Sequence, residues 1–268
     1  MKTNTNRTIA TLLAATVVAG AALCRADEAE APAVAASLDL PVLSAYVWRG
    51  QVLNDEAVLQ PSLTVSKWGL SLNAWANYNL TDNLTGDPEF TEVDLTASYG
   101  FSLGPVSLSA GVVEYLFPHQ NLTMADGTRV AYPGSREVFA TASLGGVWVV
   151  PSVSLYYDFD EADGFYASFA LASGWDCTDW LSLSASASLG VADAAYNEYY
   201  FLSDDAALND LTVGLTATCK PTDFLAITPG LQYAVLLEGD IRDSVTDSPL
   251  YFGDTDRFVA SLKASVSF

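Results

Sequence analysis

Hydrophobic and small polar residues alternate along most of the chain. From Leu181 to Val191 every second residue is Leu, Ala or Val, and the residues between them are four serines and a glycine. The same alternation runs from Leu70 to Tyr78 and from Leu211 to Ala217. A period of two places the two sets of side chains on opposite faces of a β-strand, whereas a helix repeats every 3.6 residues. The pattern therefore predicts strands with one apolar face and one polar face.

Extended over the whole chain, this pattern predicts twelve strands. They are expected at 38–49, 57–67, 69–80, 90–101, 105–116, 136–145, 147–159, 164–175, 180–191, 209–219, 224–237 and 257–268. Most approach the ~9 to 11 residues with which a tilted strand crosses a bilayer. Half of the residues are hydrophobic, yet no stretch after Leu23 has the ~18 apolar residues of a membrane helix.

The predicted connections alternate in length. Every second connection is short, namely 67–69, 102–104, 145–146, 176–179 and 220–223. The others include long Asp-rich loops at 81–89, 118–135, 192–208 and 238–256, and shorter ones at 50–56 and 160–163. Short turns on one side and longer loops on the other are typical of outer-membrane barrels. We therefore predict a transmembrane antiparallel up-and-down β-barrel, with both chain ends on the periplasmic side.

Aromatic residues cluster at both ends of the predicted strands. At the short-turn ends they are Trp68, Tyr99, Phe101, Trp148, Trp175, Trp180, Phe224 and Phe268. At the long-loop ends they are Tyr46, Trp48, Tyr78, Phe90, Tyr115, Phe117, Tyr157, Phe159, Phe165, Tyr233 and Phe258. Two such belts are expected at the two membrane interfaces. A soluble β-sandwich would also alternate, but it would require neither the belts nor the alternating connections.

The N-terminus is typical of a secreted protein. Lys2 and Arg7 precede an uncharged run that ends before Cys24-Arg25-Ala26, as in a secretory signal peptide. We expect residues 1–26 to be cleaved, 27–37 to form a flexible periplasmic leader and 38–268 to form the barrel. Cleavage removes three of 11 basic residues and none of 32 acidic residues, so the net charge becomes 8 − 32 = −24. Such a charge disfavours nucleic acid as a partner.

The mature chain offers little for a cofactor or a metal. Cys177 and Cys219 are its two cysteines, and they lack the clustered Cys and His spacing of a zinc site. Carboxylates scattered over the long loops could bind calcium or bridge lipopolysaccharide, although a solvated acidic rim is the commoner explanation. We therefore expect no cofactor, and we expect outer-membrane lipids and lipopolysaccharide as partners.

Three segments resemble known outer-membrane sequences. Residues 257–268 alternate and end on Phe268, like the C-terminal signal read by the barrel-assembly machinery. Tyr46-x-x-Arg49-Gly50 and Glu92-x-Asp94-Leu95 with Tyr99-Gly100 resemble elements of the TorF-type family of outer-membrane porins. Gln51-Val52-Leu53 departs from the Ser/Gln-rich stretch that often follows in that family. The resemblance implies outer-membrane location and a pore, with no specific cargo.

Strand parity predicts which side chains face the inside of the barrel. Twelve strands imply a bore between that of a filled eight-stranded barrel and that of an open porin. The expected pore-lining residues are Arg49, Asn73, Trp75, Asn77, Glu92, Asp94, Glu137, Asp158 and Lys263, with Gln60 and Gln232 on the same face. In the alternative, these groups satisfy one another inside a closed plug. Glu92 and Asp94 share one face and form either a cation-attracting ring or a salt-bridge network with Arg49 or Lys263.

These observations predict a porin with a narrow, mildly cation-preferring pore for small solutes. One alternative is a structural or adhesive barrel whose acidic outer loops bind a partner. A second is a hydrolase at the barrel rim, which would have to use His119, the single histidine, although no serine or acidic residue has the spacing of a catalytic partner.

Overall fold

The computed structural model describes residues 34–81, 89–123, 129–248 and 252–268. The predicted signal peptide, 1–26, and all but the last four residues of the predicted leader lie outside these ranges. Within the described residues, no helix has the length and apolar character needed to cross a membrane.

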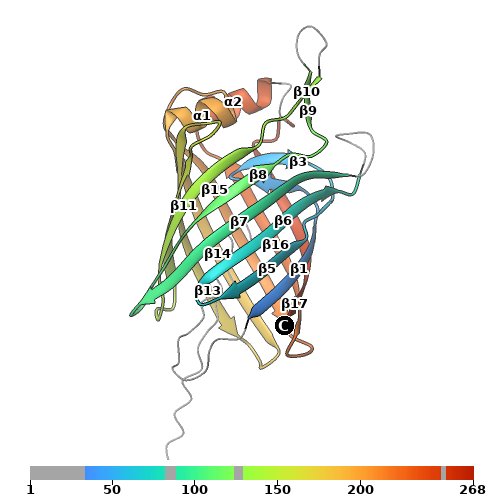
Figure 1. Cartoon of the computed structure of the whole chain (residues 1–268), viewed down its shortest axis with the longest axis vertical. Helices are drawn as coiled ribbons and strands as arrows, with labels where there is room; N and C mark the ends of the chain where they lie inside the picture. The colour runs from blue at the N-terminus through green and yellow to red at the C-terminus, as the bar shows by residue number, and fades with distance from the viewer. Residues whose placement is uncertain (1–33, 82–88, 124–128, 249–251) are drawn as a thin grey trace, which may run out of the picture.

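The described chain folds into a closed antiparallel barrel of 12 strands, as predicted (Figure 1). Its wall consists of β1 (Ala35–Leu43), β4 (Val58–Leu59) with β5 (Ser62–Lys67) as one interrupted strand, β6 (Leu70–Asn79), β7 (Phe90–Leu103), β8 (Val106–Leu116), β11 (Ser135–Leu144), β12 (Val150–Asp158), β13 (Gly164–Asp176), β14 (Leu181–Ala192), β15 (Ala207–Cys219), β16 (Leu225–Leu236) and β17 (Asp256–Ser267). Each strand pairs with its sequence neighbours in the wall, so the connections are simple hairpins.

The first and last wall strands close the barrel. β1 pairs with β17 in a register that sets Leu38 opposite Val266. At the end of this seam the Phe268 backbone N–H donates to Ala36 O at 2.8 Å, and the Ala36 N–H donates to Phe268 O at 3.3 Å. β1 therefore begins at Ala35, three residues before the predicted start of the barrel. The start of β1 and the end of β17 lie on the side of the barrel that carries the short turns, which we call the turn end (Figure 1).

The opposite end, which we call the loop end, carries the longer connections (Figure 1). It holds the hairpin β9 (Asn121–Thr123) with β10 (Arg129–Ala131), and the helices α1 (Ala194–Phe201) and α2 (Gly239–Asp247). These helices were not predicted from the sequence. Each begins at an acidic side chain that accepts a backbone N–H of the first turn: Asp193 accepts from Tyr196, and Glu238 accepts from Ile241.

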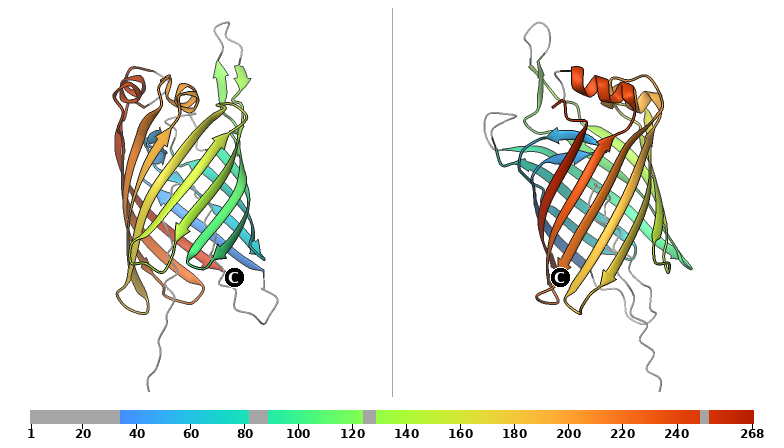
Figure 2. Two further views of the ribbon diagram at one scale, coloured as in Figure 1. Left: turned by 90° about the vertical axis from the view of Figure 1, so that its left-hand side faces the viewer. Right: turned by 180° about the vertical axis from the view of Figure 1, so that it is seen from behind.

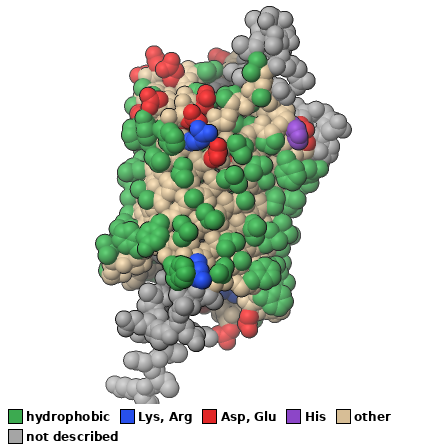
Figure 3. Space-filling view, in the orientation of Figure 1, with side chains coloured by type: hydrophobic (Ala, Val, Ile, Leu, Met, Phe, Trp, Pro, Cys, Tyr) green, Lys and Arg blue, Asp and Glu red, His purple; other side chains and the backbone are tan. Residues whose placement is uncertain are grey.

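The outer surface of the barrel is apolar over a broad band. On the face shown in Figure 3, charged side chains gather toward the two ends and leave few between them. Leu215 and Leu231, which pair across β15 and β16, are 60% and 61% exposed. The aromatic residues assigned to the turn end are all exposed, from Trp175 to Phe268. An exposed apolar band between aromatic ends is the surface that a bilayer covers.

Three of the aromatic residues assigned to the loop-end belt do not belong to it. Tyr46, Trp48 and Tyr115 are buried inside the barrel. For Tyr46 and Trp48 the reason is that the predicted strand 38–49 is wrong beyond Leu43. The chain leaves the wall there and forms a hairpin of β2 (Tyr46–Trp48) and β3 (Gln51–Asn54) before rejoining the wall at β4.

The inside of the barrel differs between its two halves. On β14, the inward-facing Ser182, Ser184, Ser186 and Ser188 are partly exposed, whereas Gly190 and Ala192 near the loop end are buried. On β12, Ser152 is partly exposed while Ser154, Tyr156 and Asp158 are buried. The turn half is thus lined by small polar groups that solvent reaches, and the loop half is packed.

Candidate functional site: a constriction in the loop half

The hairpin β2–β3 crosses the bore. It follows β1, and at its tip, Arg49-Gly50, the Arg49 guanidinium lies over the ring of Tyr156 on β12. β12 is the strand farthest from β1 in either direction around the barrel, so the tip reaches the opposite wall. Both tip residues have positive φ, 47° for Arg49 and 81° for Gly50, which is the geometry of a two-residue type I′ turn. The hairpin lies near the loop end (Figure 2).

Arg49 is held at the far wall by a bidentate ion pair. Its Nη1 and Nη2 donate to Glu137 Oε1 and Oε2 at 2.8 and 2.7 Å. Nη1 also donates to the Tyr196 hydroxyl of α1 at 2.8 Å, and the Tyr115 hydroxyl donates to Glu137 Oε2 at 2.8 Å. Two parallel hydrogen bonds of this kind fix direction as well as charge. Wall, hairpin and helix are thereby joined at one point.

Aromatic rings surround the same guanidinium. Its central carbon lies 4.5 Å from the ring centroid of Trp48, 4.4 Å from those of Tyr156 and Tyr166, and 5.5 Å from that of Tyr196. Cation–π attraction is strongest where water is excluded, and Arg49 is only 7% exposed. Burial raises the pKa of the Tyr196 hydroxyl, so this group stays neutral.

Gly50 fits closely against two further wall strands. A Cβ on this residue would lie 2.6 Å from Asp210 Cβ on β15 and 2.7 Å from Leu236 Cδ2 on β16. No side chain fits there without displacing the hairpin. Between them, Arg49 and Gly50 lie against β11, β12, β13, β15 and β16, so the hairpin spans the bore at this level.

Glu92 and Asp94 lie on β7, beside the base of the hairpin. The Tyr46 hydroxyl of β2 donates to Glu92 Oε2 at 2.9 Å, and the Tyr46 and Trp75 rings are 5.6 Å apart. Asp94 is 1% exposed; its side chain lies within hydrogen-bond reach of the Glu92 carboxyl group, and no other described group donates to its oxygens. This carboxylate pair is the least satisfied polar group of the constriction.

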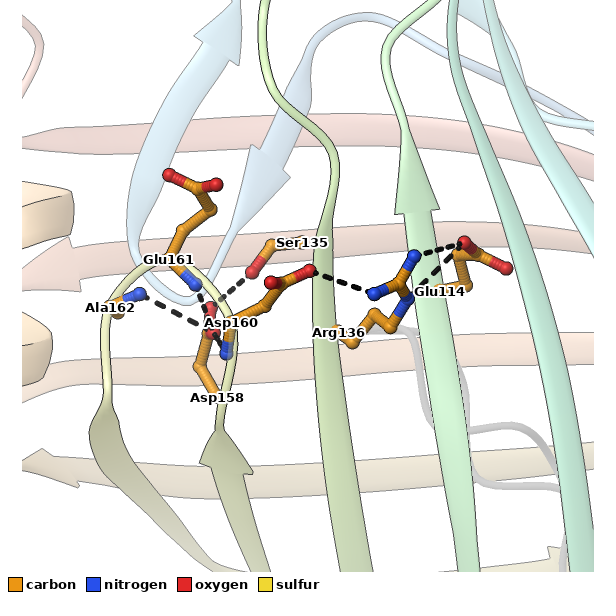
Figure 4. A network of polar contacts seen from close by, with 7 residues as sticks. All are labelled: Glu114, Ser135, Arg136, Asp158, Asp160, Glu161 and Ala162. Atoms are coloured by element: carbon orange, nitrogen blue, oxygen red, sulfur yellow. Dashed lines mark hydrogen bonds and ion pairs between the residues drawn. The ribbon is translucent and has the colours of Figure 1, made fainter.

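Asp158, in contrast, is fully satisfied (Figure 4). Ser135 Oγ and the Tyr200 hydroxyl donate to its Oδ2 at 2.7 and 2.8 Å. Its Oδ1 accepts the backbone N–H groups of Asp160 and Glu161 at 3.0 and 3.1 Å. This carboxylate therefore fixes the connection between β12 and β13, and it is 0% exposed.

Figure 4 also shows an ion pair on the outside of the barrel. Arg136 lies 3.2 Å from Glu114 and 3.3 Å from Asp160, and all three side chains are at least one third exposed. Arg136 and Glu114 follow the parity opposite to that of Glu137 and Tyr115 on the same two strands, so this pair has no part in the constriction.

The remaining expected pore-lining residues are spread along the bore. Asn77 accepts from Gln60 at 3.1 Å and donates to Asn79 and Thr91 at 3.0 and 2.9 Å, within the packed loop half. Asn73, nearer the turn end, donates to Ser62 and Thr64 at 2.8 Å. Lys263 lies 3.8 Å from Asp39 in the more open half. Of the expected set, Arg49 differs most in position, because it belongs to the hairpin and not to the wall.

Acidic groups outnumber basic ones in the packed half. Among the described residues, the buried charged side chains are Arg49, Glu92, Asp94, Glu137, Asp158 and Asp210. Asp210 accepts from the Tyr166 hydroxyl at 2.9 Å. One guanidinium therefore lies among several carboxyl groups.

Sequence reasoning missed several members of this site. Tyr166 and Asp210 alternate with apolar residues that follow them on their strands, so strand parity could have placed them inside. Tyr196 could not be placed, because it lies on a helix within a segment expected to be an irregular loop.

Other chemistry has little support in the described part of the chain. No cluster of three or more His, Cys, Asp or Glu residues is arranged to hold a metal there. Cys177 and Cys219 are free thiols. His119 is largely exposed, and its Nδ1 lies 3.4 Å from Glu89. Asp82 and Asp87, two of the loop carboxylates considered for calcium, lie outside the described residues.

Comparison with solved structures supports the class of fold. The COG4313 outer membrane channel from Pseudomonas putida F1 aligns with a TM-score of 0.51 at 12% identity, covering 91% of this chain and 100% of the channel. The KdgM porin aligns with a TM-score of 0.52 at 9% identity, covering 87% and 99%. The chain has the barrel fold of outer-membrane channels.

A family model described as "Bacterial protein of unknown function (Gcw_chp)" matches residues 26–242. The chain belongs to this family. No curated protein matches it.

Proposed function

We propose that this protein is an outer-membrane porin for small solutes, with a mild preference for cations, and that the β2–β3 hairpin holds it closed. One observation carries the proposal: the turn half of the bore is wide enough for solvent to reach Ser182 to Ser188, while a hairpin anchored by non-covalent contacts fills the loop half. If the β2–β3 hairpin is released from the wall, the bore becomes continuous from the loop end to the turn end.

The proposed location and assembly follow from the same architecture. The exposed apolar band fits the lipids of an outer membrane, and the acidic loop end fits lipopolysaccharide bridged by divalent ions. A cleaved signal peptide would deliver the chain to the periplasm, and the strand that ends at Phe268 would be read by the barrel-assembly machinery. The resemblance to TorF-type porins agrees with this proposal, and membership of that family stays a prediction.

The preference for cations is supported by the charges along the bore. Glu92, Asp94 and other carboxyl groups face inward, against Arg49 and Lys263, and both of these bases lie close to an acidic partner. A low-dielectric wall focuses the field of such groups onto permeating ions. Small cations are therefore the proposed solutes.

Planar-bilayer recording of the purified full-length mature protein tests the proposal. We expect rare, small openings for the natural protein, and larger stepwise conductance when residues 46–54 are replaced by a short Gly-Ser linker. The matched control is Glu114→Gln, which changes an exposed carboxylate outside the bore and should leave the conductance unchanged. Silence of both the natural and the linker protein, with the barrel still folded, would refute a pore.

A second candidate is a structural or adhesive barrel. The observation that favours it is the extent of packing around Arg49, which links three wall strands, the hairpin and α1. In that case the linker protein would remain silent in bilayers, and removal of loop-end segments would abolish binding to a partner surface.

A further inference from the structure

Glu92 and Asp94 form a buried carboxylate pair in the wall of the constriction. They are two residues apart on β7, both face inward, and they are 5% and 1% exposed. Each lies within electrostatic reach of the other, and Asp94 also lies within reach of Glu137. Like charges so placed repel one another unless something positive lies between them.

Asp94 has Glu92 as its polar contact, and the two side chains lie within hydrogen-bond reach of each other. Among the described residues neither oxygen of Asp94 accepts a hydrogen bond from another group, whereas Asp158 in the same packed half accepts several. Two buried carboxyl groups in contact require one positive charge between them, which is either a shared proton or a bound cation.

The nearby bases are already engaged. Arg49 gives both of its terminal nitrogens to Glu137, and Lys263 lies with Asp39 in the other half of the barrel. The Tyr46 hydroxyl donates its hydrogen bond to Glu92. The positive charge has to come from outside the chain.

The surroundings select the kind of cation. The Tyr46 and Trp75 rings lie together beside the pair, and Tyr115 is the neighbour of Asp94 on β8. Carboxylate oxygens together with aromatic rings attract monovalent cations. A tightly held divalent ion prefers more charged oxygen ligands, and the described residues provide no acidic group of three.

We propose that Glu92 and Asp94, with Tyr46, bind one monovalent cation, an alkali metal or ammonium ion, between the hairpin and the wall. The biological role of this site rests on the proposed porin function: the site would bind cations as they pass through the bore. Binding itself needs no open pore, because the site lies beside the hairpin in the closed barrel.

Rubidium provides a direct test, because it replaces potassium and scatters X-rays anomalously. Crystals of the mature protein grown in rubidium chloride should show an anomalous peak between the two carboxylates. The peak should be absent in the double variant Glu92→Gln/Asp94→Asn and present in the control Glu114→Gln. Natural protein without a peak would overturn the proposal and would mean that the pair shares a proton.

Thermal unfolding gives a second test in solution. Replacing potassium chloride by N-methylglucamine chloride at equal ionic strength should lower the unfolding temperature of the natural protein, and should leave the double variant unaffected. Equal changes in both proteins would overturn the site, as would stabilisation by calcium with no response to potassium. Bilayer recording distinguishes this outcome from failure of the porin function: binding without conductance upholds the site and refutes the pore, and conductance without binding does the reverse.

Discussion

Arg49 and Glu137, 88 residues apart in sequence, are joined across the bore by two hydrogen bonds of 2.8 and 2.7 Å. Glu137 is 0% exposed and Arg49 is 7% exposed. A buried pair contributes modestly as a pair, but the loss of one partner leaves an uncompensated charge in a dry environment. The two residues therefore act as a latch between the hairpin and β11.

Glu137→Gln should destabilise the folded barrel by about 3–5 kcal/mol, the usual cost of breaking a buried ion pair on one side. Arg49→Met should do the same, because Glu137 would then be the stranded charge. Urea unfolding in lipid vesicles, followed by tryptophan fluorescence, measures the free energy of unfolding. Glu114→Gln is the control: it breaks the exposed contact with Arg136 between β8 and β11 and should cost about 1 kcal/mol or less. Equal losses of unfolding free energy in Glu137→Gln and Glu114→Gln would contradict the latch.

Gly50→Ala should displace the hairpin and increase conductance in planar bilayers. The new Cβ would lie 2.6 Å from Asp210 Cβ and 2.7 Å from Leu236 Cδ2. Gly146 provides a control, because its φ of 78° is nearly the same and a Cβ there meets nothing within 4 Å. Gly146→Ala should carry the strain of positive φ alone, about 1–2 kcal/mol, with no change in conductance. Unaltered conductance of Gly50→Ala, with the hairpin still in place, would show that the contact at Gly50 is not needed for closure.

Leu231→Arg should destabilise the barrel much more than Gln232→Arg, although the residues are adjacent. Leu231 lies in the middle of β16 and is 61% exposed on the outer face, so a charge there should cost about 2–4 kcal/mol. Gln232 faces the bore, where arginine keeps its water and can approach carboxylates. Unfolding in vesicles compares the two variants, and equal costs would argue against a bilayer around this band.

The reversal potential in a potassium chloride gradient should show mild cation preference, stronger at low salt because salt screens the charges of the bore. The double variant Glu92→Gln/Asp94→Asn should reduce this preference, and Glu114→Gln should leave it unchanged. Anion selectivity of the natural protein would mean that Arg49 and Lys263 control the constriction while the acids are neutralised.

The wall of the barrel could be predicted from the sequence because its signal is local. Leu183 and Ser184 face opposite sides, as the period of two requires. The short turn expected at 67–69 is present, with positive φ at Trp68 and Gly69. The hairpin could not be predicted in the same way. Residues 46–49 continue the apolar pattern of the strand before them, and only their distant partners determine that they leave the wall.

The site was predicted in part for the same reason. Parity alone places Glu137 and Asp94 inside the barrel, but parity does not say which carboxylate finds a base. Glu137 meets Arg49 while Asp94 meets no base, and this difference depends on where the hairpin tip reaches. Gly50 was the one local signal, since Gly suits the second position of a type I′ turn, but Arg49 is not among the residues that favour the first position.

The seam between β1 and β17 also determines the order in which the protein can assemble. Ser44 and Ala260, which bond across it, are 216 residues apart, so this contact forms after the local hairpins that build the rest of the wall. The β2–β3 hairpin follows β1 directly and thus hangs beside the edge that is still open. A hairpin that folds toward the inside before the last strand docks would be enclosed when the wall closes. This order would avoid threading the hairpin through a closed ring.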